Sequence, residues 1–395
     1  MNPSASPALD TLSGRPDRPP AAMSLRQLTM PAMLGLLWIL FAVLSPQFLS
    51  PRNLSMLMIE LSATATLAVG VLLVLLPGHT DLSVGAGAGL AGGIASALVF
   101  DQGWPAPAAL AVSLVVGVGL YSAMGLFIVR HRIQAFIVTL GGMLAFRGAF
   151  WLVIGSATTP VVRGGETNLY SLLTTYYLPA PLGLALAAGI LATLGILQAR
   201  TRARRRALGI PVEPFEVAFL KTFLAGQGIL LAVLVCNLYR GIPLAFLILC
   251  TVAAAIHVLT RHTPFGRHLY AIGGNEEAAV VSGIPTARVV HLAFTLLGGI
   301  TALAGFMATA YAGASTTTVG DLMELDAIAA CVIGGTSLKG GRGTVLGTLF
   351  GALIMASLLN GMTLLAVSPE LKFIVRGLVL AFAVWMDVRF NRASA

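Results

Sequence analysis

Residues 261–288 read RHTPFGRHLYAIGGNEEAAVVSGIPTAR, and this polar stretch separates two apolar segments, residues 242–260 and 289–311. Each apolar segment is close to the roughly 20 residues that cross a bilayer as a helix. The composition agrees, because 57% of the 395 residues are hydrophobic and 10% are charged, whereas a soluble domain has about 25% charged residues. Such a chain cannot cover a globule with polar surface, so we expect an all-α integral membrane protein.

The polar stretch contains the signal of one short helix. Asn275 can cap a first turn that carries Glu276 and Glu277, where a helix N-terminus favours negative charge. Gly283 can close the helix in a left-handed conformation, and Pro285 prevents it from continuing. A helix of about two turns is marginal alone in water, so we expect another protein to hold it.

Apolar segments recur along the chain. We predict twelve of them, at residues 30–49, 55–76, 82–100, 106–129, 134–155, 180–198, 219–237, 242–260, 289–311, 325–335, 343–366 and 371–388. The tenth is too short to span alone and is rich in small residues, so it is expected to be re-entrant or broken. Residues 1–29 predict a disordered cytoplasmic tail, and residues 30–392 predict a single transmembrane domain.

Lysines and arginines predict the orientation. If the N-terminus is cytoplasmic and all twelve segments cross, most of the 24 Lys and Arg residues fall in cytoplasmic loops, where positive charge accumulates. Both termini are then cytoplasmic, together with residues 261–288 and the basic run RTRARRR at 200–206. This run could bind anionic lipid or nucleic acid, although we favour a role in anchoring the topology. The loop charges conflict unless residues 325–335 cross in some form.

The sequence contains no motif for its own energy source. It has no G-x-x-x-x-G-K-[ST] sequence that would bind ATP phosphates, so active transport needs an ion gradient or a partner. The three cysteines lack metal-ligand spacing, and we interpret them as small core residues with no metal site.

Charged residues inside or beside the apolar segments should face protein or water, because each is costly in lipid. They are Glu60, Asp81, Arg147, Glu324, Asp326, Arg376 and Asp387. We favour structural pairing or placement near the membrane surface over a proton relay. The residues alone leave open an ion-coupled secondary carrier. A membrane-embedded enzyme is a further alternative, although no cluster of His or acidic residues supports it.

Several motifs occur together. Glu277-Ala278-Ala279-x-x-x-Gly283 resembles the E-A-A-x-x-x-G loop of permease subunits of ABC importers. Other stretches are similar to the branch that imports ribose, galactose and xylose: DLSVG at 81–85, FIVTLG at 136–141, YAIGGN at 270–275, ELDAIAA at 324–330, VIGGTSL at 332–338 and NGM at 360–362. The stretch MLAFRG at 143–148 and an extra hairpin at 180–237 resemble the D-xylose type, which implies about ten core helices plus this hairpin.

This resemblance implies a division of labour in a bacterial inner membrane. Two permease copies would form the pathway, a separate cytoplasmic subunit would bind and hydrolyse ATP, and a periplasmic protein would deliver the sugar. The permease itself would be no enzyme and would hold no cofactor, and it would contact membrane lipid and no nucleic acid. The sugar would be D-xylose, with ribose, galactose or another monosaccharide left open.

The resemblance also implies roles for particular residues. The ATPase-coupling loop would comprise Asn275, Glu276, Glu277, Ala278, Ala279 and Gly283. Candidate pathway or gating residues are Asp81, Ser83, Arg147, Glu324, Asp326 and Asn360.

Overall fold

The computed structural model describes residues 25–212 and 214–392. Within these ranges the helices are α1 (Leu25–Leu44), α2 (Pro51–Leu75), α3 (Val84–Phe100), α4 (Ala106–His131), α5 (Ala135–Val153), α6 (Leu169–Thr175), α7 (Ala180–Ala207), α8 (Phe215–Asn237), α9 (Leu244–His262), α10 (Pro264–Gly274), α11 (Glu276–Val281), α12 (Thr286–Ala312), α13 (Met323–Ile333), α14 (Val345–Leu364) and α15 (Pro369–Arg392). Residues 1–24 of the predicted tail lie outside the described residues, and the remainder of it already belongs to α1.

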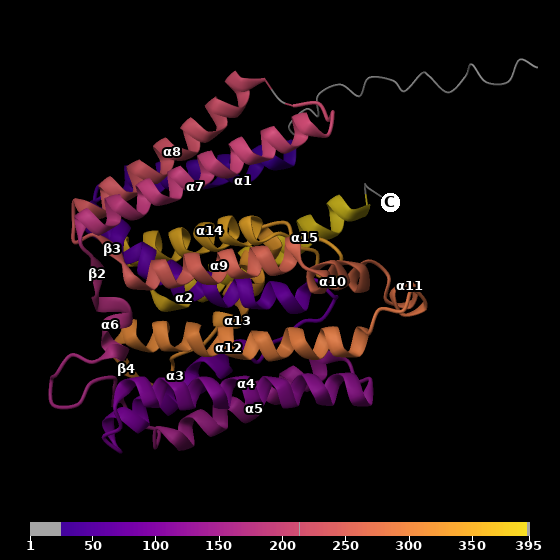
Figure 1. Cartoon of the computed structure of the whole chain (residues 1–395). Coiled ribbons are helices and arrows are strands. Elements are labelled where there is room, and N and C mark those ends of the chain that lie inside the picture. The colour runs from indigo at the N-terminus through magenta and orange to yellow at the C-terminus, as the bar shows by residue number, and fades with distance from the viewer. Residues whose placement is uncertain (1–24, 213, 393–395) are drawn as a thin grey trace, which may run out of the picture.

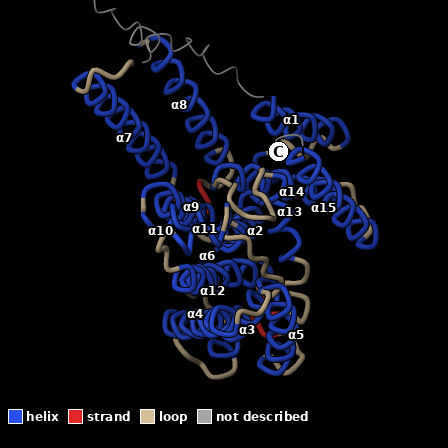
Figure 2. The backbone as a smooth tube through the Cα atoms, turned by 90° about the vertical axis from the view of Figure 1, so that its right-hand side faces the viewer, coloured by secondary structure: helices blue, strands red, loops and turns tan. Residues whose placement is uncertain are grey.

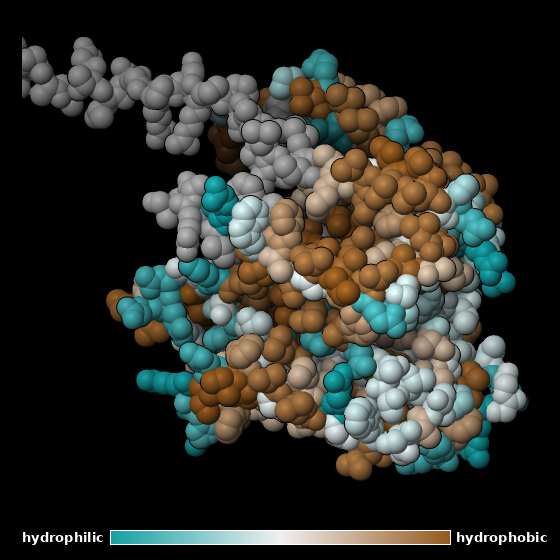
Figure 3. All heavy atoms as spheres, turned by 180° about the vertical axis from the view of Figure 1, so that it is seen from behind, coloured by the Kyte–Doolittle hydropathy of each residue, from teal (hydrophilic) through white to brown (hydrophobic). Residues whose placement is uncertain are grey.

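Each of the twelve predicted apolar segments coincides with a helix, so the prediction of an all-α membrane protein is confirmed (Figure 1). Among the described residues, eight helices are long and apolar enough to cross a membrane, namely α2, α4, α5, α7, α8, α9, α12 and α14. The view from behind shows hydrophobic side chains over a broad central area and hydrophilic ones gathered toward its margins (Figure 3). This distribution suits a molecule whose middle lies in lipid.

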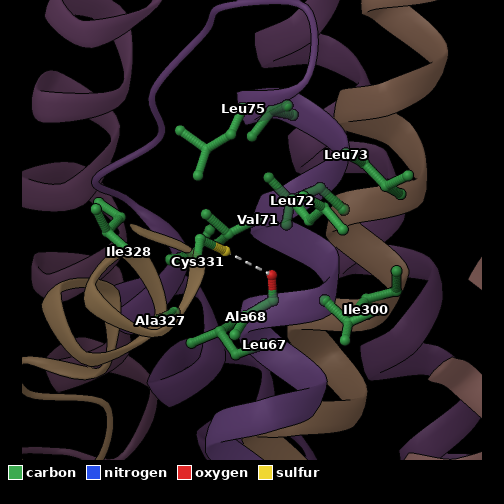
Figure 4. Close-up of a cluster of buried hydrophobic side chains, with 14 of the residues drawn as sticks. Leu67, Ala68, Val71, Leu72, Leu73, Leu75, Ile300, Ala327, Ile328 and Cys331 are labelled. Atoms are coloured by element: carbon green, nitrogen blue, oxygen red, sulfur yellow. Dashed lines mark hydrogen bonds between the residues drawn. The ribbon is translucent and has the colours of Figure 1, made fainter. Parts of the chain in front are cut away.

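The centre of the molecule is α2, which packs against α9, α12, α13 and α14. From Leu67 to Leu75 this helix is apolar and buried on every side, so it is stable only when other helices surround it. In the core, Val71 of α2 lies beside Cys331 of α13 (Figure 4), and Gly70 of α2 faces Ile300 of α12. The thiol of Cys331 on α13 donates a hydrogen bond to the Ala68 carbonyl oxygen at 3.2 Å.

The interpretation of the cysteines as core residues holds for two of the three. Cys236 and Cys331 are buried, whereas Cys250 is exposed on α9. An apolar side chain on a membrane helix can face lipid as well as the core, and for that reason hydrophobicity alone could not separate these positions.

Close packing around α3 depends on small residues. This helix is buried between α4, α5 and α12. A Cβ atom at Gly87 would overlap Tyr121 of α4, and one at Gly92 would overlap the Thr309 side chain of α12. Glycine therefore lets α4 and α12 approach the α3 backbone closely.

Four two-residue strands lie at the end of the molecule opposite α11 (Figure 1). The strands are β1 (Thr159–Pro160), β2 (Tyr177–Leu178), β3 (Ile242–Pro243) and β4 (Ala314–Ser315). Antiparallel pairs join β1 to β4 and β2 to β3. Between β1 and β2, α6 is anchored by Tyr170, which is fully buried and donates a hydrogen bond to the Gly92 carbonyl oxygen at 2.9 Å.

The hairpin predicted at residues 180–237 is present as α7 and α8. It packs on the body near β3, where Ala187, Val233 and Ile242 form a small core. From there the two helices run away from the other helices (Figure 2). The helix α7 continues through the basic run to Ala207, beyond the predicted end at residue 198.

Candidate functional site

The polar stretch 261–288 folds into two short helices, α10 and α11, between α9 and α12. Asn275 caps α11, because its side-chain oxygen accepts a hydrogen bond from the Ala278 amide at 2.9 Å. Gly283 follows the helix with a left-handed φ of +79°, a conformation that closes helices and favours glycine. The short helix predicted at residues 275–283 is confirmed.

The surface of α11 is largely uncovered. Of its six residues only Ala279 is buried, while Glu276 and Glu277 are exposed in the first turn. Val280 and Val281 are 54% and 89% exposed. Two helical turns have little stability of their own, and one buried alanine anchors them. The two valines therefore leave an apolar surface of α11 uncovered.

The end of α10 lies against two loops from distant parts of the chain. A Cβ atom at Gly273 would overlap the Leu76 carbonyl oxygen at the end of α2 and also the Gly341 amide nitrogen in the loop 334–344. The Gly341 amide donates a hydrogen bond to the Leu76 carbonyl oxygen at 2.9 Å. We call Leu76, Gly273 and Gly341 the glycine junction, because two glycines allow three backbones to meet there.

Side chains tie the glycine junction to its surroundings. The Tyr270 hydroxyl of α10 donates a hydrogen bond to the Gly343 carbonyl oxygen at 2.8 Å. His79, in the loop after α2, packs against Phe294 of α12 with ring centroids 6.3 Å apart. Burial lowers the pKa of His79, and the charge of Glu276 partly opposes this effect. The first turn of α11 is therefore close enough to act electrostatically on the loop that follows α2.

The two loops of the glycine junction adjoin two short helices whose first turns meet. The loop 76–83 leads into α3, and the loop 334–344 follows α13. A Cβ atom at Gly85, in the first turn of α3, would overlap the Glu324 carboxylate in the first turn of α13. Helices that begin inside the protein are typical of transporters with broken helices.

The predicted residues Asp81, Ser83 and Glu324 come together at this meeting point. Asp81 is fully buried, and one of its carboxylate oxygens accepts hydrogen bonds from the amide and the hydroxyl of Ser83, both at 2.6 Å. The Ser83 hydroxyl also lies 3.2 Å from the Tyr121 hydroxyl. A carboxylate at this position stabilises the positive end of the α3 dipole.

The other predicted charges form pairs. Arg147 of α5 is paired with Asp321, and their side chains are 39% and 40% exposed. Arg376 of α15 lies 3.5 Å from Asp326 of α13. Structural pairing is confirmed at these positions, and both pairs link an outer helix to the segment around α13.

Asn360 belongs to a separate network. Its amide nitrogen lies 3.4 Å from a carboxylate oxygen of Glu60, and its oxygen accepts a hydrogen bond from Asn53 at 2.9 Å. The Tyr311 hydroxyl donates to the other Glu60 oxygen at 2.8 Å. The predicted pathway residues are thus divided among several places, and the side chain of Asp387 lies outside the described residues.

Sequence reasoning missed α10 and the glycine junction. A signal for α10 existed, because Thr263 before Pro264 is a cap pattern and Phe265, Leu269 and Ile272 recur at helical spacing. No such signal existed for the glycine junction, because its members lie far apart in the sequence and meet only through backbone contacts in the folded chain.

Known proteins are similar to the chain along most of its length. A family model described as branched-chain amino acid transport system / permease component matches residues 53–384. The xylose transport system permease protein XylH of Escherichia coli (strain K12) is 41% identical over 348 residues, which cover 88% of this chain and 87% of that protein. XylH of Haemophilus influenzae is 39% identical over 342 residues, 86% and 90% of the two chains.

A ribose permease is more distantly similar. The ribose import permease protein RbsC of Bacillus subtilis (strain 168) is 33% identical over 354 residues, which cover 90% of each chain. No solved structure matches the chain significantly.

The resemblance to sugar-import permeases is therefore confirmed. Its matched region runs from the beginning of α2 into α15 and includes both the glycine junction and α11. With its long apolar helices, the chain is a multi-pass protein of the bacterial inner membrane. The chain belongs to the family of branched-chain amino acid transport system permease components.

Proposed function

We propose that the chain is the permease subunit of an ATP-driven sugar importer, and that α11 docks on a separate ATP-binding subunit. The observation that carries this proposal is the uncovered apolar surface of α11. Glu277, Val280 and Val281 are spaced i, i+3 and i+4, so they share one face of the helix. A groove in a partner would cover this face and supply the stability that two turns lack.

We propose D-xylose as the sugar. The support is the identity of 41% and 39% to two proteins named as xylose permeases, against 33% to a ribose permease. Ribose, galactose or another monosaccharide is the alternative within the same function, because a separate sugar-binding protein would make much of the selection.

In the proposed orientation, α10 and α11 face the cytoplasm. The basic tip of α7 and the C-terminal end of α15 lie at the same end of the molecule as α11 (Figure 1), which agrees with the accumulation of positive charge on the cytoplasmic side. Both termini are then cytoplasmic, with ten core helices besides the α7–α8 hairpin. The opposite end, with α6 and the paired strands, would receive the periplasmic sugar-binding protein.

The glycine junction gives a route by which α11 can act on the membrane helices. Closure of the ATP-binding subunit would shift α11 and the adjoining α10. Gly273 has no free space against Leu76 and Gly341, so movement of α10 toward them would displace both loops. One loop leads into α3 and the other follows α13. The first turns of these two helices meet at Gly85 and Glu324.

The pathway would lie between two copies of the chain. Arg147 lies within α5, one of the helices long enough to span, yet its side chain and that of Asp321 are well exposed. Charges exposed to lipid at this depth are costly, so this face would meet water or a second permease. In the end-on view, α5 and α15 border the same side of the molecule (Figure 2).

Reconstituted transport tests this function. Proteoliposomes would contain the permease, its ATP-binding subunit and its sugar-binding protein, with labelled D-xylose outside and ATP on the side of α11. Uptake should require ATP, survive a protonophore, and be outcompeted by unlabelled xylose more than by ribose or galactose. Uptake that persists without ATP and is abolished by the protonophore would identify an ion-coupled carrier instead.

A matched pair of variants tests the docking surface. Val281→Asp should weaken binding of the ATP-binding subunit and reduce ATP-dependent uptake, because it places a charge in an apolar contact. Ala287→Asp, an exposed residue in the first turn of α12, adds the same charge nearby and should leave both nearly unchanged. Equal effects of the two substitutions would refute docking through this face of α11.

A further inference from the structure

The tip of the α7–α8 hairpin carries a concentrated positive charge that the transport function does not use. Five arginines occupy the last turns of α7: Arg200, Arg202, Arg204, Arg205 and Arg206. The helix has 28 residues, about 42 Å at 1.5 Å per residue, whereas the hydrocarbon core is about 30 Å thick. About twenty helical residues span the hydrocarbon core, and counted from Ala180 they end at Ala199. The arginines therefore begin at the level of the lipid headgroups.

The arginines lie on different faces of α7. Arg202 and Arg205 share a face with Gln198 and Thr201, because these positions are spaced i, i+3, i+4 and i+7. This face and α8 border an open recess of about 330 Å³, which Val212 also lines. At 100° per residue, Arg200 points to the opposite side of the helix, and Arg204 points away from the recess, about 100° from Arg205.

The recess is a built site, because its polar side chains are held in place. The Gln198 amide donates a hydrogen bond to the Ala218 carbonyl oxygen at 2.7 Å, and its oxygen accepts one from the Thr222 hydroxyl. The Arg202 guanidinium is half-buried and donates to the Pro214 carbonyl oxygen at 3.4 Å. A guanidinium has five N–H donors, so Arg202 can still bind an anion.

An apolar row begins beside the recess. The Arg202 guanidinium lies 5.7 Å from the Phe215 ring centroid. Phe219 stacks on Phe215, and Phe223 stacks on Phe219, with ring centroids 6.1 and 5.8 Å apart. All three rings are well exposed and continue along α8 into the hydrocarbon depth. A ligand that fits both features has an anionic head and a long apolar tail.

We propose that this recess binds the phosphate headgroup of an anionic phospholipid, with its acyl chains along the phenylalanine row of α8. Arg202 and Arg205 contact the phosphate, and Gln198 and Thr201 complete the polar wall. The two arginines match the negative charge, and a guanidinium suits phosphate geometry particularly well. Inorganic phosphate shares the head chemistry but would leave the apolar row without a role.

Native mass spectrometry of the full-length permease in detergent tests this site, because detergent removes the surface potential of a bilayer. The probe is phosphatidylglycerol, and phosphatidylethanolamine with the same acyl chains is the zwitterionic comparison. The R202Q/R205Q variant should bind phosphatidylglycerol about 30-fold more weakly, at about fivefold for each arginine contact. The R200Q/R204Q variant removes the same charge from arginines that do not line the recess and should bind within about threefold of the unmodified protein.

Each contrary result overturns a particular part of the proposal. Equal weakening in the two double variants would mean diffuse attraction without a site, and equal binding of the zwitterionic lipid would refute recognition of charge. Displacement of the lipid by millimolar inorganic phosphate would identify a free-anion site. Binding that appears only when the ATP-binding subunit is present would assign the recess to a protein contact. The single Arg205→Gln change, at an exposed side chain, should weaken binding about fivefold without affecting folding.

Discussion

Replacing Gly273 by alanine would test the glycine junction, because the new methyl group has no free space. It would overlap backbone atoms of Leu76 and Gly341, and overpacking of this kind costs about 1–3 kcal/mol. Loss of the hydrogen bond between those two residues adds about 0.5–1.5 kcal/mol. The higher helix propensity of alanine offsets up to about 1 kcal/mol. We therefore expect Gly273→Ala to lower the free energy of unfolding by about 0.5–4.5 kcal/mol.

The neighbouring glycine provides the control. Gly274 has no heavy atom within 4 Å of a Cβ position, so Gly274→Ala should be neutral or stabilise the protein by up to about 1 kcal/mol. A thiol-reactive dye can follow unfolding in detergent, because Cys236 and Cys331 are buried in the folded chain. In proteoliposomes, Gly273→Ala should also raise the ATP hydrolysed per xylose transported while the ATP-binding subunit still binds α11. If the two variants behave alike in both assays, the glycine junction is not a route of coupling.

Three further changes test other parts of the structure. Burial lowers the pKa of His79 below 6.5, so below about pH 6.5 the unfolded chain binds a proton that the folded chain excludes, and stability is lost as pH falls. The melting temperature should therefore fall more steeply between about pH 7 and 5 in the unmodified protein than in His79→Gln. Parallel curves for the two proteins would contradict the burial of His79. Gly283→Ala places a side chain at φ +79°, which costs roughly 1–2 kcal/mol, so affinity for the ATP-binding subunit should fall at least about fivefold with normal membrane insertion. Arg147→Asp should abolish uptake, and a second change of Asp321→Arg should recover part of it, whereas failure of the exchange to recover any uptake would mean that their pairing does not matter.

Most of the helices could be predicted because each membrane span is a continuous run of about 20 apolar residues, which can be recognised without knowledge of the rest of the chain. The cap of α11 was equally local, since Asn275, Glu276 and Gly283 act within one short segment. The order of the apolar runs along the sequence did not show that α13 begins inside the protein. The start of α13 is buried because it packs against the first turn of α3, which lies far away in the sequence.

Contacts between distant residues account for what the sequence left open. The pairing of Glu324 with the glycine face of α3, and of Gly273 with Leu76, requires the packed fold. Asn360 belongs to a family-like motif, yet the structure places it beside Glu60 and away from Asp81. The helix α14 runs antiparallel to α2, so its C-terminal end, which carries Asn360, lies beside the first half of α2.

Photo-crosslinking at α11 tests the central claim most directly. A photoreactive amino acid would replace Val281, which is 89% exposed, in the full-length permease in cells, and Ala287 would carry the same group as the control position. The account predicts that Val281 crosslinks to a protein that contains the phosphate-binding G-x-x-x-x-G-K-[ST] motif, identified by mass spectrometry, and that the control position does so far less. Crosslinks from Val281 only to lipid or to another permease copy would contradict the claim that α11 receives the ATP-binding subunit.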